Sequence, residues 1–448
     1  MIYVLSAVIV LGVLIFVHEL GHFLAARAVG IYVIRFSFGL GPKTPLAVKL
    51  GETEYCLSWV PFGGYVKMAG AEDDTPGQLE GEREDAHVPP ERTFDHQPLA
   101  ARIFVISAGV LMNVVFAVVV YTVLAWHYGV ARDTTVTVGE VHAGQLPLGA
   151  TGLGALAPGD RILRINGDSM TGWSDVTRAL MTAERTPLRI DVAGRAQPLF
   201  ADVPLGDQDD RQAIVTALVP AHPPVIGEVI AGDPAARGGL RQGDRVLRAA
   251  GDTVTSWEQF VTVIQAHPAA PLPLVVQRDS ATMSLTVTPR AEAHAATAPS
   301  RTIGWIGVAP YRRVTRFGLV GSVREGFAET EDAAGLVVFT LKNLVLGRLS
   351  PKDIGGPILI GEASGEAAKL GIGAFLDFMA LFSVNLAVLN LLPVPVLDGG
   401  HLLFLFIEGV RRRPLSVELR QRWMTVGLVL ILMLMALALY NDVMRLVR

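Results

Sequence analysis

One pentapeptide near the start of the chain decides how the rest is interpreted: His18-Glu19-Leu20-Gly21-His22. It lies inside an apolar run, residues 2–26, and in a helix its two histidines share one face, one turn apart. Two imidazoles so placed can share one metal ion, usually zinc, with Glu19 beside them as a general base. A soluble helix could carry the same pattern as two core histidines and one surface carboxylate. In an apolar run of membrane length, however, three polar side chains are costly and indicate function.

Composition points to a membrane protein. Of 448 residues, 51% are hydrophobic and only 18% are charged, against about 25% charged in soluble domains. The formal net charge of −4 provides no global basic surface, so we expect no nucleic-acid partner. Cys56 is the lone cysteine, which excludes an intrachain disulfide and a cysteine-cluster zinc site. Because the first apolar run lacks a basic leader and a clear cleavage site, we predict a retained membrane helix.

Four apolar stretches are long enough to cross a bilayer core of about 30 Å: residues 2–26, 103–126, 375–397 and 423–440. Cationic residues gather between the first and second stretches and between the third and fourth: Arg27, Arg35, Lys43, Lys49, Arg92, Arg102, Arg411, Arg412, Arg413, Arg420 and Arg422. The positive-inside rule therefore places both short loops in the cytoplasm. Both termini and the long middle segment then face the other side.

The first loop divides into two parts. Residues 31–69 alternate strand-like runs with glycine and predict β-hairpins beside the first helix. Residues 72–90 are acidic and contain Gly and Pro, so we expect a loop there, with the role of residues 72–85 left open.

The middle of the chain contains a duplication. The segment 158–163 recurs as 242–247, 84 residues later, and Trp173 recurs at the same offset as Trp257. Each unit of about 80 residues predicts short strands, a Gly-Asp turn and a helix. The units resemble PDZ domains of the bacterial protease type, and Leu240–Gly251 departs from that pattern only at Ala250, where asparagine is usual. Such domains bind extended peptide at a sheet edge, although these two could instead be spacers or filters.

A third metal ligand is needed, since two histidines leave zinc short of protein ligands. Asp398 is the best candidate, because it follows a run in which Pro393 and Pro395 break the helix and free backbone groups that could hold an extended substrate. Two alternatives stay open: Asp398 as a helix N-cap, and His401 as the ligand.

Together these motifs resemble the site-2 protease family of intramembrane zinc metalloproteases over essentially the whole chain. The resemblance implies that His18, His22 and Asp398 bind one Zn²⁺ per chain and that Glu19 is the general base. It also implies that two groups of residues bind the substrate, one along its path and one on a β-strand beside it: Asn385, Asn390, Pro393 and Pro395; Phe62, Gly63, Gly64 and Tyr65.

The implied fold class is a polytopic α-helical membrane protein with four transmembrane helices, membrane-associated β-hairpins and two tandem PDZ domains of mixed α/β type. The expected divisions are helices 1 and 2 with the zinc motif and a cytoplasmic-side hairpin loop, two PDZ domains, a linker with interfacial amphipathic helices, and helices 3 and 4 with the third ligand. Their ranges are 1–128, 129–220, 221–290, 291–370 and 371–448.

The resemblance implies an endopeptidase of the bacterial inner membrane with periplasmic PDZ domains. Its substrates would be single-pass membrane proteins, such as anti-sigma factors or signal-peptide remnants, cut in the bilayer after an upstream site-1 protease. The alternative is a catalytically silent PDZ scaffold that binds protein C-termini, which the presence of all four catalytic residues disfavours. A metal transporter would need polar residues along several helices, and in the second helix we assign Asn113 to helix packing.

Overall fold

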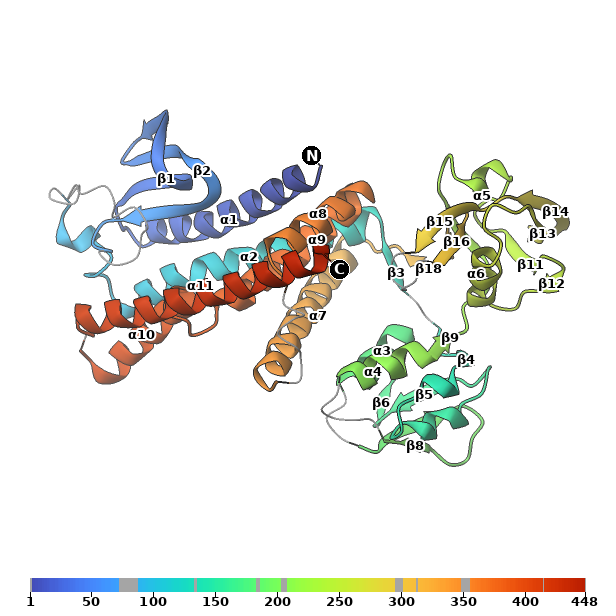
Figure 1. Ribbon diagram of the computed structural model, residues 1–448. Coiled ribbons are helices and arrows are strands. Elements are labelled where there is room, and N and C mark those ends of the chain that lie inside the picture. Colours follow the sequence, from blue (N-terminus) through green and yellow to red (C-terminus); the bar gives the residue numbers. More distant parts are fainter. Residues whose placement is uncertain are drawn as a thin grey trace. The chain divides into compact units, whose positions relative to one another are not determined.

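The computed structural model describes residues 2–71, 88–132, 135–182, 186–202, 208–294, 301–311, 313–347, 355–413 and 415–447. These residues form two compact units, Met1–Gly129 with Arg316–Arg448, and Val130–Thr315 (Figure 1). The acidic loop expected at residues 72–90 lies outside the described residues up to position 87.

Four helices of the first unit are, within the described residues, long and apolar enough to cross a membrane. They are α1 (Ile2–Ala28), α2 (Leu99–His127), α9 (Ile372–Asn390) and α11 (Val417–Val447). The outward face of α2 exposes Leu111, Val115 and Val119, which follow one another at the helical spacing of four residues. Side chains of this kind suit contact with lipid, so the four spans agree with a membrane protein.

The third apolar stretch ends earlier as a helix than its composition suggests. We expected a span of residues 375–397, whereas α9 ends at Asn390 and a new helix, α10 (Asp398–Arg411), begins eight residues later. Pro393 and Pro395 explain the break, because proline lacks an N–H and has a fixed φ. The turn between the helices folds tightly onto α10, since a Cβ at Gly399 or Gly400 would collide with its carbonyl groups.

A single curled hairpin fills the first loop. It consists of β1 (Val33–Leu50) and β2 (Thr53–Met68). Residues 35–38 of β1 pair with residues 54–57 of β2 on one side and with residues 64–67 on the other, so two long strands make a sheet of four segments. The hairpin packs on α1 through Phe36, whose ring lies 5.2 Å from that of Phe23. Residues 64–68 are therefore an edge segment beside α1.

Further helical elements accompany the four spans. They are η2 (Pro90–Arg92), α7 (Leu319–Val345) and α8 (Pro357–Lys369). The two nitrogens of Arg92 donate to Glu52 at 2.8 and 2.6 Å, and this hydrogen bonding lowers the pKa of Glu52. Helix α7 packs on α2, where a Cβ at Gly326 would collide with Thr122. Asp442 of α11 accepts hydrogen bonds from the first N–H groups of α8 at 2.9 Å, which caps that helix.

The second unit contains two lobes with the same strand order. Repeat 1 has a sheet β6-β5-β7-β8 and repeat 2 a sheet β12-β11-β13-β14. Its elements, in chain order, are β3 (Val130–Arg132), β4 (Val138–Val141), η3 (Ala143–Gln145), η4 (Thr151–Ala155), β5 (Ile162–Ile165), β6 (Asp168–Ser169), α3 (Trp173–Thr182), β7 (Leu188–Val192), β8 (Leu199–Ala201), α4 (Gln208–Ala217), β9 (Leu218–Pro220), β10 (Ile226–Val229), α5 (Pro234–Arg237), β11 (Arg245–Ala249), β12 (Asp252–Thr253), α6 (Trp257–Gln265), β13 (Leu272–Arg278), β14 (Ala281–Val287), β15 (Arg290–His294), β16 (Arg301–Trp305), β17 (Val308–Pro310) and β18 (Arg313–Thr315).

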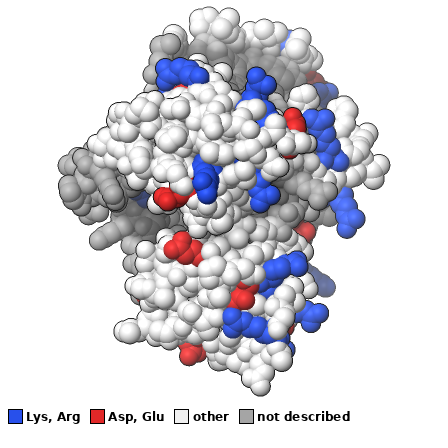
Figure 2. Space-filling model, turned by 90° about the vertical axis from the view of Figure 1, so that its right-hand side faces the viewer, with Lys and Arg blue, Asp and Glu red and all other residues white. Residues whose placement is uncertain are grey.

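Repeat 2 extends past the expected boundary at residue 290. Strand β17 pairs with β10, just as β9 pairs with β4 in repeat 1, and Ile306 is 2% exposed in the core of repeat 2. The structure thus includes residues 301–310, which we had expected to be linker, in this lobe. Figure 2 shows basic and acidic side chains interspersed on the face that it presents.

The departure at Ala250 has a structural cause. Asn166 and Ala250 occupy matching left-handed positions, each with φ of 52°. In repeat 1 the side-chain oxygen of Asn166 accepts the N–H of Arg189 at 3.0 Å. The residue that receives the backbone N–H of Ala250 is Pro273, which has no N–H to offer an asparagine. Repeat 2 therefore carries the left-handed strain of alanine without a compensating hydrogen bond.

Glycine substitution should have opposite effects at these two positions. We expect Ala250→Gly to stabilise repeat 2 by about 0.5–1 kcal/mol, because glycine adopts positive φ without a steric cost. Asn166→Gly should destabilise repeat 1 by about 1 kcal/mol, because the hydrogen bond to Arg189 is lost. Hydrogen exchange of β11 and β5 in the full-length protein measures both. Faster exchange of β11 in Ala250→Gly would contradict the strain at this residue.

Candidate metal centre

The first two candidate ligands face α2 across a close helix contact. A Cβ at Gly21 of α1 would collide with the backbone oxygen of Ala108 in α2, and a Cβ at Gly109 would collide with the rings of His18 and His22. Small residues at both positions let the two backbones approach, as is common between membrane helices. The space that Gly109 leaves empty is the space that the two imidazoles occupy.

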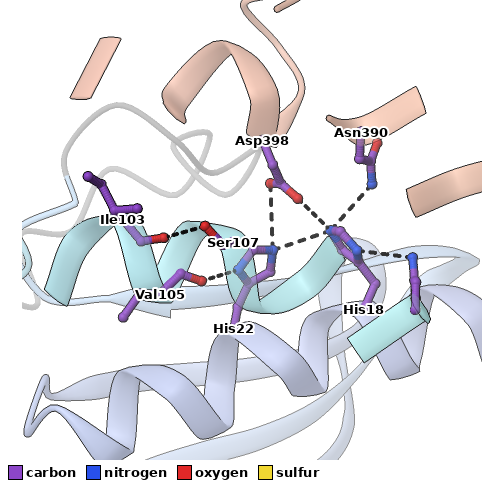
Figure 3. Close-up of polar contacts among 8 residues, drawn as sticks. His18, His22, Ile103, Val105, Ser107, Asn390 and Asp398 are labelled. Atoms are coloured by element: carbon purple, nitrogen blue, oxygen red, sulfur yellow. Dashed lines mark hydrogen bonds and ion pairs between the residues drawn. The ribbon is translucent and has the colours of Figure 1, made fainter. Parts of the chain in front are cut away.

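Asp398 completes a group of three side chains that could hold a metal ion (Figure 3). Its carboxylate oxygens lie 3.2 Å from Nε2 of His18 and 3.6 Å from Nε2 of His22. The two Nε2 atoms are 3.2 Å apart. Ligands bound tetrahedrally to zinc at about 2.0–2.2 Å are about 3.4 Å from one another. The distance to His18 involves Oδ2 of Asp398 and the distance to His22 involves Oδ1. With one ligand atom from each side chain, all three atoms lie within 4.8 Å of one another, which suits one zinc ion. Among the described residues the group has three members, which leaves the fourth position open, as in catalytic zinc sites.

The geometry disfavours both alternatives to Asp398 as the third ligand. Leu397, and not Asp398, occupies the N-cap position of α10. The side chain of Asp398 points at the two histidines instead. His401 lies one turn further along α10 and borders the same cavity, but it does not belong to the described group of potential ligands.

The outer nitrogen of His22 is fixed by α2. Its Nδ1 lies 2.9 Å from the backbone oxygen of Val105, in a buried contact. Because a carbonyl can only accept, Nδ1 carries the proton and Nε2 is left free for a metal. The donor set and its support therefore both suit a zinc ion bound through Nε2.

Glu19 lies between the histidines and the hairpin. Its carboxylate accepts a hydrogen bond from the backbone of Val66, and a Cβ at Gly64 would be 3.2 Å from Glu19 Cγ. Both contacts border a cavity of about 190 Å³ that is also lined by His18, His22 and Asp398. A carboxylate in this position can exchange a proton with a molecule in the cavity.

The edge of the curled sheet forms one wall of this cavity. Residues 64–68 pair with β1 on one side, and Gly64, Tyr65 and Val66 line the cavity. Gly63 precedes them with φ of 108°, a conformation that favours glycine. The side chain of Phe62 lies outside the described residues. An edge strand so placed can pair with an extended chain in the cavity.

The other four predicted substrate residues are not among those that line this cavity. Asn390, at the end of α9, places its amide nitrogen 3.5 Å from Nε2 of His18 (Figure 3). Asn385 lies earlier in α9 and is not among the residues that line the cavity. Pro393 and Pro395 border a separate apolar hollow of about 150 Å³. Of these four, the structure brings Asn390 alone to the metal-binding group.

One supporting contact escaped sequence analysis, the ion pair of Arg102 in α2 and Glu408 in α10. One guanidinium nitrogen donates to a Glu408 oxygen at 3.3 Å and a second makes a shorter bond. Leu405, between Glu408 and Asp398 on the same helix face, shares a core with Val105. The pair thus holds α10 on α2 and keeps Asp398 near the histidines. Charges inside apolar helices are a signal that could have identified it.

Breaking this pair should loosen the metal-binding group. Glu408→Ala leaves Arg102 without its buried partner, at a cost of about 3 kcal/mol, so we expect a lower Tm in detergent and weaker zinc binding. The charge-swapped double variant Arg102→Glu, Glu408→Arg should recover part of both. Equal Tm and zinc affinity in Glu408→Ala and the unaltered protein would show that the pair does not hold α10.

Comparisons with known proteins agree with this geometry. A model of peptidase family M50 matches residues 6–434. The regulator of sigma-E protease RseP of Salmonella typhimurium is 33% identical over 460 residues, 98% of each chain. RseP of Escherichia coli is 33% identical over 462 residues, also 98% of each chain. Because the family model and these relatives extend over nearly the whole chain, this chain belongs to peptidase family M50, the family of site-2 proteases.

Proposed function

We propose that this zinc metalloprotease is an intramembrane endopeptidase with one zinc ion per chain, held by His18, His22 and Asp398. The observation that carries the proposal is the convergence of these three side chains within a unit built on membrane-length helices. An open fourth position leaves room for the reacting groups.

The mechanism follows from the residues around the cavity. Zinc held there would activate water and polarise the scissile carbonyl. Glu19 takes the proton from the attacking water and later gives it to the leaving amine. Asn390, whose amide nitrogen is 3.5 Å from His18, donates a hydrogen bond to the negative charge that develops on the carbonyl oxygen.

Substrate binding falls to the edge of the hairpin. A transmembrane helix hides its amide groups in its own hydrogen bonds, so it must unwind before hydrolysis. Gly63, Gly64 and Tyr65 belong to the segment that would pair with the unwound chain, since residues 64–68 have β1 on one side and the cavity on the other. Asn385, Pro393 and Pro395 lie outside the cavity lining and would contact the substrate away from the zinc site.

We further propose that the substrates are single-pass membrane proteins already cut by a site-1 protease, such as anti-sigma factors or signal-peptide remnants. Relatives of Salmonella typhimurium and Escherichia coli are named as regulators of sigma-E protease, which supports this class and a place in the bacterial inner membrane. The two lobes of the second unit would be periplasmic PDZ domains that filter substrates by size or bind their peptide ends.

The scaffold alternative makes no use of the metal-binding group. A protein that only captured C-termini would need neither Glu19 beside the histidines nor the open fourth position. Measuring zinc content and cleavage in the same variants therefore separates the two functions.

Glu19→Gln should keep zinc and lose cleavage. The three ligands remain in this variant, while removal of the general base should slow hydrolysis about 10²- to 10⁴-fold. Asp398→Ala should lose both, because zinc then keeps two protein ligands. Elemental analysis of purified protein and cleavage of a transmembrane reporter measure these outcomes. Normal zinc content in Asp398→Ala would move the third ligand to His401.

The topology can be tested independently. Reporter fusions after Arg413 should be cytoplasmic, because arginines gather in that loop, and fusions at Gly232 in repeat 2 should be periplasmic. Phosphatase and fluorescent-protein fusions distinguish the two sides. The reverse pattern would put both repeats in the cytoplasm and would remove the proposed role on periplasmic substrates.

A further inference from the structure

A buried amide lies behind the first metal ligand. Asn113 of α2 is 0% exposed, and its side-chain nitrogen is 3.2 Å from Nδ1 of His18. Its side-chain oxygen is buried and has no hydrogen-bond partner. Buried polar atoms in proteins are nearly always paired, so this orphan oxygen calls for an explanation.

The protonation of His18 indicates how the amide of Asn113 is oriented. Nε2 of His18 faces Asp398 at 3.2 Å, on the side where the three ligand atoms converge. A neutral imidazole that binds a metal through Nε2 carries its proton on Nδ1. The group next to Nδ1 must then accept a hydrogen bond, whereas the amide nitrogen of Asn113 can only donate.

Turning the amide by 180° resolves the conflict between the two donors at Nδ1 of His18. The oxygen and nitrogen of an asparagine amide have nearly the same shape, and their assignment follows from the hydrogen-bond network. In the turned orientation the oxygen faces the Nδ1–H of His18. The buried oxygen gains a donor and the contact between two donors disappears, while the amide nitrogen takes the position in which the oxygen had no partner.

We propose that Asn113 is a positioning residue whose amide oxygen accepts the Nδ1–H of His18 and so keeps Nε2 free for zinc. This inference rests on the zinc ligands proposed above. The carbonyl of Val105 does the same for His22 at 2.9 Å. Helix α2 would then orient both histidines, one through its backbone and the other through a side chain.

Helix packing, the role that sequence analysis assigned to Asn113, involves different atoms. The hydroxyl of Ser383 in α9 donates to the backbone oxygen of Asn113 at 2.9 Å. That contact between helices does not use the amide side chain, which is directed at His18. Loss of packing and loss of the acceptor can therefore be separated by substitution.

The test measures zinc affinity of full-length protein in detergent, by competition with a chromogenic chelator, and the visible spectrum with Co²⁺ in place of zinc. Asn113→Leu keeps the volume but removes the acceptor, so we expect the zinc Kd to rise about 10- to 100-fold and the Co²⁺ bands to shift. Asn113→Asp keeps an acceptor and should bind zinc at least as tightly as the unaltered protein. Ser383→Ala removes the packing contact and should leave the Kd unchanged.

Two results would overturn the proposal. One is an unchanged zinc Kd and Co²⁺ spectrum in Asn113→Leu. The other is equal weakening in the Leu and Asp variants together with equal loss of Tm, which indicates packing. Asp398→Ala is included to separate this inference from the proposed ligands. If it loses zinc while Asn113→Leu keeps it, only the role of Asn113 fails; if it binds zinc normally, the ligand assignment fails.

Discussion

The approach of Asp398 to two histidines more than 370 residues earlier in the chain is the contact on which the first unit depends. Without a metal, an aspartate and two imidazoles between apolar helices would be costly to bury. Helix α2 makes the contact possible, because Gly109 leaves room for both rings and Arg102 holds α10 in place. The hairpin lines another side of the cavity with Gly64–Val66.

The helix break before α10 brings Asp398 toward the two histidines. A continuous helix through residues 375–397 would carry its last residues past the histidines. The break at Pro393 and Pro395 ends α9 at Asn390 and starts α10 at Asp398, so that one residue from each helix end faces His18. Gly399 and Gly400 allow the turn to pack against α10.

Local pattern was enough to predict that His18 and His22 lie together, because a four-residue spacing on a helix fixes a face. It left Asp398 and His401 both open as the third ligand, and the resemblance to a known family favoured Asp398, which the structure places beside the two histidines. Local pattern could not predict contacts between residues that lie far apart in the sequence. The strand at 308–310 belongs to repeat 2 because it pairs with β10, and no local sequence feature predicts that pairing. Likewise Pro393 and Pro395 interrupt the helix but border a different hollow. The presence of a proline predicts a helix break, but it does not predict which residues the proline ring contacts. The Arg102–Glu408 pair joins residues 306 apart.

The two histidines lie close to one end of α1, which explains how a site among apolar helices could be reached by the water that hydrolysis consumes. His22 lies six residues before the end of α1 at Ala28, and His18 ten residues before it. At a rise of 1.5 Å per residue, the ligands are about 9 and 15 Å from that helix end. The curled hairpin begins five residues after α1 ends and borders the same cavity. In the proposed function, water would therefore have a short distance to cover. A substrate helix would need to unwind only its last turns, where hydrogen bonds are fewest, to reach the edge strand.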